Sequence, residues 1–370
     1  MFQNSYSGKR VFLTGHTGFK GSWLAEWLLE LGAEVHGYAL DPQPHELLFG
    51  QLDLASRLAV DHRADLADLP CLTTAIRAAD PDYVFHLAAQ PLVRLSYEIP
   101  VETFATNVIG TAHVLEAVRN LDKPCTVLCV TTDKCYENRE WLHSYREEDA
   151  MGGHDPYSAS KGAAELVIAS YRKSFFSTHD GDSDASVLVA SARAGNVVGG
   201  GDWAKDRIVP DCIRALRAGE KIKVRNKTAT RPWQHVLEPL SGYLWLASQL
   251  RHFAGLASAF NFGPALTSNR TVAALVQELL KHIDGDWLDA SNPNALHEAS
   301  KLNLAIDKAF HLLNWQPVWN FEETILQTAT WYALEHRGEN PGDITRRQIH
   351  TYRQDALAKG LPWATTDQAN

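Results

Sequence analysis

Cysteines, long apolar runs and basic clusters are all scarce in this 370-residue sequence, and each shortage excludes a class of protein. The five cysteines are scattered and odd in number, which predicts reduced thiols in a cytoplasm rather than a disulfide framework. No apolar run reaches the roughly 18 residues of a membrane span. The first apolar run meets Gly15 almost at once, so we also expect no signal peptide.

Positive charge is in deficit as well. The chain has 35 Lys and Arg residues against 44 Asp and Glu residues, so its formal net charge is −9. It lacks the cationic face that duplex binding needs, and we expect no nucleic-acid partner. The 24 glycines and 16 prolines exclude a long coiled coil, while a hydrophobic fraction of 45% predicts a globular core. Cys125 and Cys129 have a spacing that some metal sites use, but they lie in an apolar run, and we expect no metal.

The first half of the chain alternates short apolar runs with amphipathic stretches, which is typical of βαβ units. The predicted strands cover residues 10–14, 34–39, 58–63, 83–87, 126–131 and 186–192. The predicted helices cover residues 19–31, 69–79, 101–120 and 158–176. Because short connections favour right-handed crossovers, we expect an α/β fold with a Rossmann-type, doubly wound parallel sheet.

The alternation loosens after about residue 193. The predicted helices there cover residues 208–218, 239–251, 272–282, 303–313 and 321–336, and the predicted strands cover 222–225 and 259–262. We therefore expect a dinucleotide-binding domain over residues 1–192, with the catalytic residues in it. Residues 193–340 would form a smaller mixed substrate-binding region that can cross back to the sheet, and residues 341–370 a polar, partly mobile tail.

A glycine-rich loop follows the first predicted strand and opens the first predicted helix. Gly15, Gly18 and Gly21 have the spacing G-x-x-G-x-x-G. Such glycines permit a tight turn and close approach of the backbone to a pyrophosphate, and the helix N-terminus offers free N–H groups to it. The loop therefore predicts a dinucleotide site.

Two acids after later strands are candidates for the nucleoside end of that dinucleotide. Asp41 lies 20 residues after Gly21, where a carboxylate can accept hydrogen bonds from the ribose and repel a 2′-phosphate. This favours NAD over NADP, although His16 and Lys20 add positive charge to the loop. Asp65 can meet the adenine edge or, alternatively, cap a helix.

Tyr157 and Lys161 form a Y-x-x-x-K motif, which places both side chains on one face of a helix. A free phenol has a pKa near 10, and a nearby lysine together with a nicotinamide cation favours the phenolate. Such a group can take a proton from a hydroxyl while hydride leaves the same carbon. Thr132 ends the fifth predicted strand, where its hydroxyl can bind the same substrate oxygen. The motif alone also fits a surface helix, but its position in a glycine-loop domain favours the catalytic interpretation.

Several stretches together resemble the extended short-chain dehydrogenases/reductases over residues 10–336. They are G-H-T-G-F-K-G at 15–21, H-L-A-A-Q at 86–90, Asn107, the Tyr157/Lys161 pair, and L-N-W-Q-P at 313–317, where the family usually has Gly at position 314. The resemblance implies cofactor contacts from the glycine loop and from the ends of the following strands. These residues are Gly15, His16, Thr17, Gly18, Phe19, Lys20, Gly21, Asp41, Asp65, Leu66, Leu87, Ala88, Ala89, Tyr157 and Lys161.

Within that family the chain is most similar to the nucleotide-sugar 4,6-dehydratases, and among these to the group that acts on CDP-D-glucose. The longest matching stretches are T-T-D-K-C-Y-E-N at 131–138, A-R-A-G-N-V-V-G-G-G-D-W at 192–203 and R-P-W-Q-H-V at 231–236. The resemblance implies oxidation of the sugar at C4 with NAD, loss of water across C5 and C6, and return of hydride to C6. It also implies a CDP-glucose substrate, a role in O-antigen-type deoxysugar synthesis, and a homodimer or homotetramer paired through the helices at 101–120 and 158–176.

Elimination of water needs a proton donor for the C6 hydroxyl and an acceptor for the C5 proton. The resemblance assigns the donor to Asp133, whose pKa burial would have to raise; a loop-capping role is the alternative. Lys134 departs from dTDP-glucose relatives, which have Asp-Glu here. A lysine can be the C5 base if it is desolvated, or it can stabilise the enolate electrostatically. Both alternatives stay open.

The substrate diphosphate needs cationic and amide donors. The candidates for it are Arg193, Asn196, Arg207 and Arg231. Gln90 and Arg94 follow the fourth strand and can meet the pyranose. His235 sits in an apolar run, where a core histidine and a substrate ligand are equally consistent with the sequence.

Other functions fit parts of this pattern. A different nucleotide-sugar 4,6-dehydratase would use the same residues, and a UDP-sugar 4-epimerase would use Tyr157 and Lys161 but not the Asp133–Lys134 pair. A non-catalytic NAD-sensing regulator would typically lose the Tyr or the Lys, and this chain keeps both.

Overall fold

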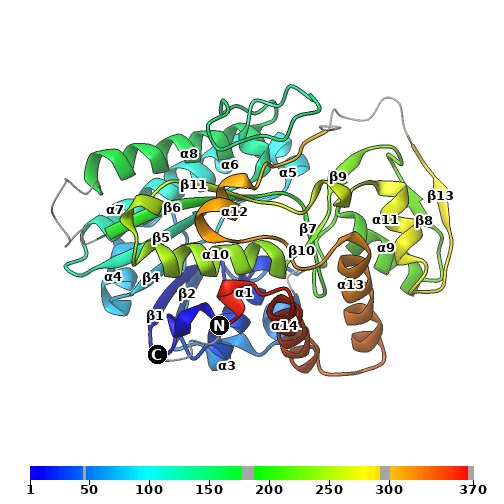
Figure 1. Ribbon diagram of the computed structural model, residues 1–370, viewed down its shortest axis with the longest axis horizontal. Helices are drawn as coiled ribbons and strands as arrows, with labels where there is room; N and C mark the ends of the chain where they lie inside the picture. Colours follow the sequence, from blue (N-terminus) through cyan, green and yellow to red (C-terminus); the bar gives the residue numbers. More distant parts are fainter. Residues whose placement is uncertain (45–46, 177–186, 292–300, 366–370) are drawn as a thin grey trace.

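Seven parallel strands form the centre of the molecule, in the order β11-β6-β5-β4-β1-β2-β3 (Figure 1). The computed structural model describes residues 1–44, 47–176, 187–291 and 301–365. The strands are β1 (Arg10–Thr14), β2 (Glu34–Ala39), β3 (Val60–Arg63), β4 (Tyr83–His86), β5 (Cys125–Val130), β6 (Val187–Ala194) and β11 (Ala259–Phe262). The strand order reverses next to β1, so the predicted doubly wound α/β fold is confirmed. Residue 186, where one strand was expected to begin, lies outside the described residues.

Helices cover both faces of this sheet (Figure 1). One face carries α4 (Leu69–Ala79), α7 (Gly110–Arg119) and α8 (Pro156–Phe175), and the other carries α1 (Phe19–Glu30) and α10 (Leu237–Leu250). Successive strand residues point to opposite faces, so Phe12, Val84 and Val127 join one core cluster, while Leu13, Phe85 and Leu128 join the other. The two clusters differ in composition, because every tryptophan packed in them belongs to the cluster on the α1 and α10 face.

Local sequence signals explain where the long helices begin. The Asp68 side chain accepts a hydrogen bond from Cys71 N at the start of α4, and Asp155 accepts one from Ser158 N at the start of α8. Asn320 and Glu323 form a reciprocal capping box at the start of α13 (Phe321–His336). These three caps explain why the predicted helix starts at 69, 158 and 321 lie within two residues of the observed ones.

Beyond β6 the chain builds a smaller mixed region, to the right in Figure 1. Its strands are β7 (Val197–Val198), β8 (Ile222–Val224), β9 (Thr230–Pro232), β10 (Gln234–His235), β12 (Asn269–Thr271) and β13 (Trp287–Asp289), and its helices include α9 (Ile208–Arg217), α11 (Val272–Leu279) and α13. They pair as β7–β10, β8–β13 and β9–β12. The chain also returns to the main sheet, where β11 lies beside β6 and α12 (Asp307–Leu313) packs on β11. One apolar core therefore joins both parts.

Several short elements are absent from the sequence prediction. They are the helices α2 (Leu47–Gln51), α3 (Leu54–Arg57) and α5 (Val93–Glu98), and the 3₁₀ turns Phe2–Asn4, Asp133–Cys135, Ala254–Leu256, Leu266–Ser268 and Pro362–Ala364. The helix predicted at 101–120 is continuous but contains a π-helical turn, Ala105–Ile109, between α6 (Pro100–Phe104) and α7. Among the described residues, no helix is long and apolar enough to cross a membrane.

The expectation of a polar, partly mobile tail is wrong for residues 341–365. Pro341–Ala358 form helix α14, which packs against α1, and Leu361 and Trp363 are buried beyond it. The helix is polar on average but buries one side, where Tyr352 lies against three tryptophans at ring-centroid distances of 4.9–5.9 Å. The Trp363 ring stacks on Phe2 at 5.3 Å, so the two ends of the described chain meet.

Tyr352→Ala should destabilise the fold, because it removes a fully buried ring and its hydrogen bond to Glu238 Oε2 at 2.7 Å. Large-to-small aromatic substitutions in cores typically cost about 3–5 kcal/mol. The measurement is urea unfolding, with the exposed His350→Ala on the same helix as control. Equal unfolding midpoints for the two variants would show that α14 is not part of the cooperative core.

Candidate active site

The carboxyl ends of the central strands open into one large cavity of about 1550 Å³. This exceeds the roughly 300–1,000 Å³ of most small-molecule sites, so it has room for two ligands side by side. Most residues singled out from the sequence line it. They are Gly15, Thr17, Gly18, Phe19, Lys20, Gly21, Asp41, Asp65, Leu66, Leu87, Ala88, Ala89, Gln90, Arg94, Thr132, Asp133, Lys134, Tyr157, Lys161, Asn196, Arg207 and Arg231.

The glycine loop forms one wall by backbone contact. Gly15 has φ +76°, and a Cβ on it would lie 2.7 Å from Ala88 N at the end of β4. A Cβ on Gly21 would lie 2.0 Å from Gly15 O. Gly18 precedes α1 without a side-chain cap, so the first N–H groups of the helix are available. A cradle of this kind fits a dinucleotide pyrophosphate.

The two acids proposed for the nucleoside end follow β2 and β3. Asp41 is exposed two residues beyond the end of β2, and Asp65 lies two residues beyond β3. The alternative of a helix cap for Asp65 is wrong, because Asp68 caps α4, whereas Asp65 accepts from Ala67 N at 2.9 Å. Both carboxylates remain on the cavity wall.

Thr132, Asp133 and Lys134 form a tight turn directly beyond β5. The Thr132 hydroxyl donates to Asp133 Oδ1 at 2.9 Å and accepts from Lys134 N at 3.4 Å. Asp133 is 2% exposed, and this burial raises its pKa, with Lys134 opposing. The close packing needs a glycine at 195, where a Cβ would lie 2.9 Å from Asp133 Oδ2. A buried carboxyl with a raised pKa can carry a proton at a higher pH than a free aspartate.

Tyr157 and Lys161 reach the same cavity from the first two turns of α8. Burial lowers the pKa of Lys161 to about 8, and its ammonium donates to Val130 O at 3.5 Å. Burial raises the pKa of Tyr157 to about 12, although a hydrogen bond with Thr132 and the charge of Arg207 oppose this. The sequence predicts that a lysine and a nicotinamide cation favour the phenolate. The groups of the chain alone do not bring the pKa of Tyr157 near neutral pH.

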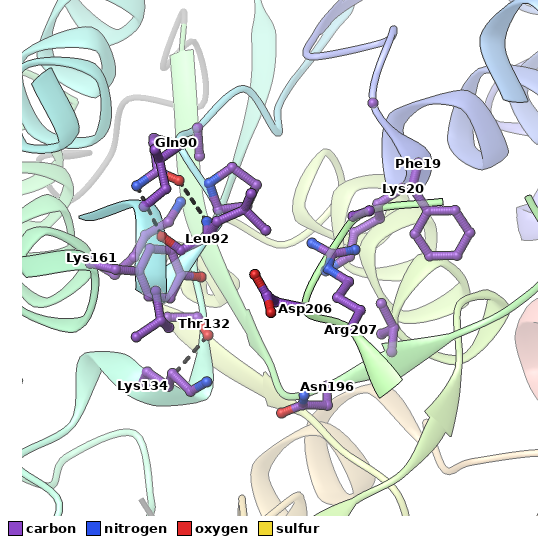
Figure 2. A pocket seen from close by; sticks show the side chains of 18 of the residues that line it. Phe19, Lys20, Gln90, Leu92, Thr132, Lys134, Lys161, Asn196, Asp206 and Arg207 are labelled. Carbon is purple, nitrogen blue, oxygen red and sulfur yellow. Dashed lines mark hydrogen bonds between the residues drawn. The ribbon is translucent and has the colours of Figure 1, made fainter. Parts of the chain in front are cut away.

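Cations lie opposite the turn formed by Thr132, Asp133 and Lys134. Figure 2 shows Lys20 and Arg207 on one side of the cavity, with Thr132, Lys134 and Lys161 on the other. Burial, together with the charges of Arg207 and Lys161, lowers the pKa of Lys20 to about 7. Arg207 donates to Asp202 Oδ2 at 2.9 Å, which orients its guanidinium. The cavity can therefore attract and hold an anion.

Three candidate residues do not line the cavity. Arg193 is 4% exposed and ion-paired with Glu165 at 2.9 Å, so its assignment to the substrate diphosphate is wrong. His235 is fully buried between the rings of Trp23 and Trp319, as a core histidine. The ring of His16 is buried against Asp61 at 2.7 Å.

The two candidates for the pyranose are engaged by protein groups. The Gln90 amide donates to Leu92 O and Thr103 Oγ1 and accepts from Leu92 N, so it stabilises the turn after β4. Arg94 donates to Asp206 Oδ1 at 3.2 Å. Asn107 lies in the π-helical turn. Its side chain accepts a hydrogen bond from Gln90 N and donates one to Ser160 Oγ, and Ser160 lies between Tyr157 and Lys161 in the sequence.

Sequence reasoning missed the charged residues at the mouth of the cavity. Asp206 lies near the centre of the view in Figure 2 and also accepts from Arg225 at 2.7 Å. Arg225 directly follows β8, a position that could have been flagged by the same strand-end argument used for the first half. No sequence signal marks Asp206, because its role comes from meeting arginines 112 and 19 residues away.

Sequence comparison places the chain among nucleotide-sugar enzymes. A family model described as GDP-mannose 4,6 dehydratase matches residues 12–328. A CDP-glucose 4,6-dehydratase of Salmonella typhimurium is 47% identical over 353 residues, covering 95% of this chain and 98% of that protein. A dTDP-glucose 4,6-dehydratase of Streptomyces antibioticus is 30% identical over 334 residues, covering 87% and 92%.

Solved structures show the same fold at lower identity. DesIV, a dTDP-glucose 4,6-dehydratase from Streptomyces venezuelae with NAD and TYD bound, superposes with a TM-score of 0.73 at 22% identity, covering 89% of this chain and 98% of that one. A UDP-glucose 4-epimerase from Thermotoga maritima gives a TM-score of 0.73 at 21% identity, covering 88% and 99%. Dehydratases and epimerases share this fold, so the fold alone does not choose between them.

Gly15→Ala should weaken NAD binding by about tenfold or more, because a left-handed backbone conformation costs an alanine roughly 1–2 kcal/mol and the new Cβ would clash with Ala88 N. The measurement is titration of the chain with NAD. Gly50→Ala is the control, since a Cβ there meets nothing within 4 Å. Unchanged affinity in Gly15→Ala would place the dinucleotide elsewhere.

Proposed function

This chain belongs to the GDP-mannose 4,6-dehydratase family, and from that premise we propose that it is an NAD-dependent hydro-lyase acting on CDP-D-glucose. The product is CDP-4-keto-6-deoxy-D-glucose. The observation that carries the proposal is the meeting of Thr132, Asp133, Lys134 and Tyr157 in one cavity, in a chain 47% identical to a CDP-glucose 4,6-dehydratase over nearly its whole length.

The residues after Thr132 favour dehydration over epimerisation. An epimerase needs a proton acceptor and donor at C4 only, whereas dehydration also needs groups at C5 and C6. Asp133 is a buried acid hydrogen-bonded by Thr132, and Lys134 follows it on the cavity wall. This acid–lysine pair has no task in a 4-epimerase.

The cavity fits NAD at the glycine loop. Gly15, Gly18, Gly21 and the N-terminus of α1 would hold the pyrophosphate, and Asp41 the ribose. When bound, NAD supplies an acceptor for the hydride from C4 and a donor of hydride to C6. It ends in its starting state, so no second substrate is needed.

The chain's own residues move the protons. Tyr157, as phenolate, takes the proton of the C4 hydroxyl, with Thr132 hydrogen-bonded to the same oxygen. Asp133 gives its proton to the departing C6 hydroxyl, which leaves as water while a double bond forms between C5 and C6. Lys134 has two alternative roles. It takes the C5 proton as the base, or it stabilises the enolate by its positive charge. Lys161 contributes positive charge beside the phenolate.

Arg231, Arg207 and Asn196 are the proposed diphosphate ligands. All three come from the second half of the chain and line the cavity. Guanidinium groups match phosphate oxygens in pairs, which suits the two arginines to a diphosphate. Residues 193–340 therefore supply the substrate side of the site, and residues 1–192 the cofactor side.

We propose a homodimer, with a homotetramer as the alternative. The proposed interface is formed by α6 with its π-helical turn and by the neighbouring helix α8. They leave Val101, Ile109 and Leu166 more than half exposed. Exposed apolar side chains on adjacent helices are typical of an interface between copies.

The free cysteines, of which four of the five are buried, support a cytoplasmic location. The 4-keto-6-deoxy product suits O-antigen-type deoxysugar synthesis.

Asp133→Asn should separate oxidation from dehydration. It keeps Tyr157, Lys161 and the cofactor site but removes the proton donor, so the reduced nicotinamide should form with CDP-glucose and then persist. The readouts are nicotinamide absorbance and the 4-keto product; general acid loss typically costs about 10²–10⁴-fold in rate. Tyr157→Phe is the control that should form no reduced nicotinamide.

The outcomes discriminate between the assignments. Near wild-type dehydration in Asp133→Asn would remove Asp133 from the elimination step. If Lys134 takes the C5 proton, its exchange with deuterated water should stop in Lys134→Met but continue in Asp133→Asn. A wild-type chain that makes no 4-keto product from CDP-glucose contradicts the proposed function itself.

Leu166→Glu should convert the dimer to a monomer, because a carboxylate would be buried at the centre of the interface. Sedimentation velocity at micromolar concentration measures this. Leu312→Glu on α12 is the control, since Leu312 is similarly exposed but lies outside the proposed interface. A monomeric wild type would contradict the dimer.

A further inference from the structure

A buried carboxylate lies one helical turn beyond Lys161 on α8. Glu165 is 4% exposed and accepts three hydrogen bonds, one from the segment that follows β5 and two from β6. They come from Thr131 Oγ1 at 2.5 Å, Ser191 Oγ at 2.8 Å and Arg193 Nη2 at 2.9 Å. Burial alone would raise the pKa of Glu165, but Arg193 and these donors hold it below its ordinary value, so the carboxylate is charged.

Arg193 extends this contact to the far side of the catalytic turn. Its Nη1 donates to Tyr136 Oη at 2.7 Å and to Glu147 O at 3.0 Å, and the guanidinium lies 5.0 Å from the centre of the Tyr136 ring. Tyr136 in turn donates to Asn261 Oδ1 at 2.8 Å on β11. The Tyr136 hydroxyl is thus hydrogen-bonded to side chains from two strands, β6 and β11.

The two residues that this ion pair binds, Thr131 and Tyr136, flank the catalytic turn. Thr131 immediately precedes Thr132-Asp133-Lys134, and Tyr136 follows one residue after that turn, beyond Cys135. Neither Glu165 nor Arg193 lines the cavity. They therefore act on the turn only through its two flanking residues, and they do not face a ligand bound in the cavity.

Stability alone does not explain a charged pair in this position. Replacing a buried ion pair by well-packed apolar residues is often neutral or stabilising, because the desolvation cost offsets the attraction. A charged pair with several hydrogen bonds can instead fix the positions of the side chains that it binds. Here Glu165 accepts a hydrogen bond from Thr131, at one end of the turn, and Arg193 donates one to Tyr136, at the other end.

We propose that the Glu165–Arg193 ion pair is a positioning device that sets the place of Asp133 and Lys134 for the elimination step. The proposal rests on the proposed function for its kinetic readout. Both are positioning residues, acting through Thr131 and Tyr136. They should affect the rate of dehydration and not the affinity for the nucleotide sugar.

The test uses variants at the rim of the network, because Glu165→Gln leaves a buried unpaired cation and can fail to fold. Thr131→Val removes the hydrogen bond at one end of the turn, and Tyr136→Phe removes it at the other. Ser191→Ala is the matched control, since it removes a comparable hydrogen bond to Glu165 from a strand residue that does not flank the turn. Thr131→Ser keeps the hydroxyl and should restore activity.

We expect kcat to fall by about 10²-fold in Thr131→Val and Tyr136→Phe, the loss typical of a ~1 Å misplacement of a catalytic group. KM for CDP-glucose should stay close to wild type, and reduced nicotinamide should accumulate during turnover. Ser191→Ala should lose similar thermal stability but keep kcat. If Thr131→Val and Ser191→Ala have equal kcat, the proposal is overturned.

A crystallographic comparison separates this proposal from the proposed function. In Thr131→Val the turn carrying Asp133 should be displaced relative to its place in Ser191→Ala. An undisplaced turn overturns the positioning role, even if the wild-type enzyme dehydrates CDP-glucose. A displaced turn supports it, even if the wild type were to make no product from that sugar.

Discussion

Backbone contact at Gly15 and Gly21 is the constraint on which the rest of the site depends. With no side chain at either position, the loop closes onto the end of β4 and onto itself, and α1 can begin immediately beside it. The start of α1 fixes one wall of the cavity, and its far side fixes the place of α14. A methyl group at either glycine would therefore meet backbone atoms at once and disturb the cofactor wall.

Ten lysines and arginines and ten acids line the cavity, so its formal charge is balanced, whereas that of the whole chain is −9. Lys20, Lys161 and Arg207 share this cavity with two buried acids, Asp133 and Asp202, and Asp202 is ion-paired with Arg207. Burial pushes the pKa of the lysines down and that of Asp133 up, so all of them move toward the pH of the cell. A pKa shifted toward neutral pH eases proton transfer, which an elimination bracketed by oxidation and reduction requires.

Elements with strong local signals could be predicted from the sequence, and contacts between distant elements could not. β1, β2, β11, α4 and α13 have their predicted bounds because apolar periodicity, proline positions and caps act within a few residues. The site residues attached to strand ends, such as Asp41 and Thr132, also reached the cavity. Arg193 did not, because its partner Glu165 lies on another element, and α14 was missed because a polar average hides one buried side.

The uneven placement of tryptophan in the two core layers has a practical consequence for spectroscopy. Every tryptophan in a core cluster lies on the α1 and α10 side of the sheet, and the cluster beneath α4, α7 and α8 has none. Intrinsic fluorescence therefore reports the melting of one layer and is nearly silent about the other. Loosening of α8, the helix that carries Tyr157 and Lys161, would need a tyrosine signal or a label placed on that side to be seen.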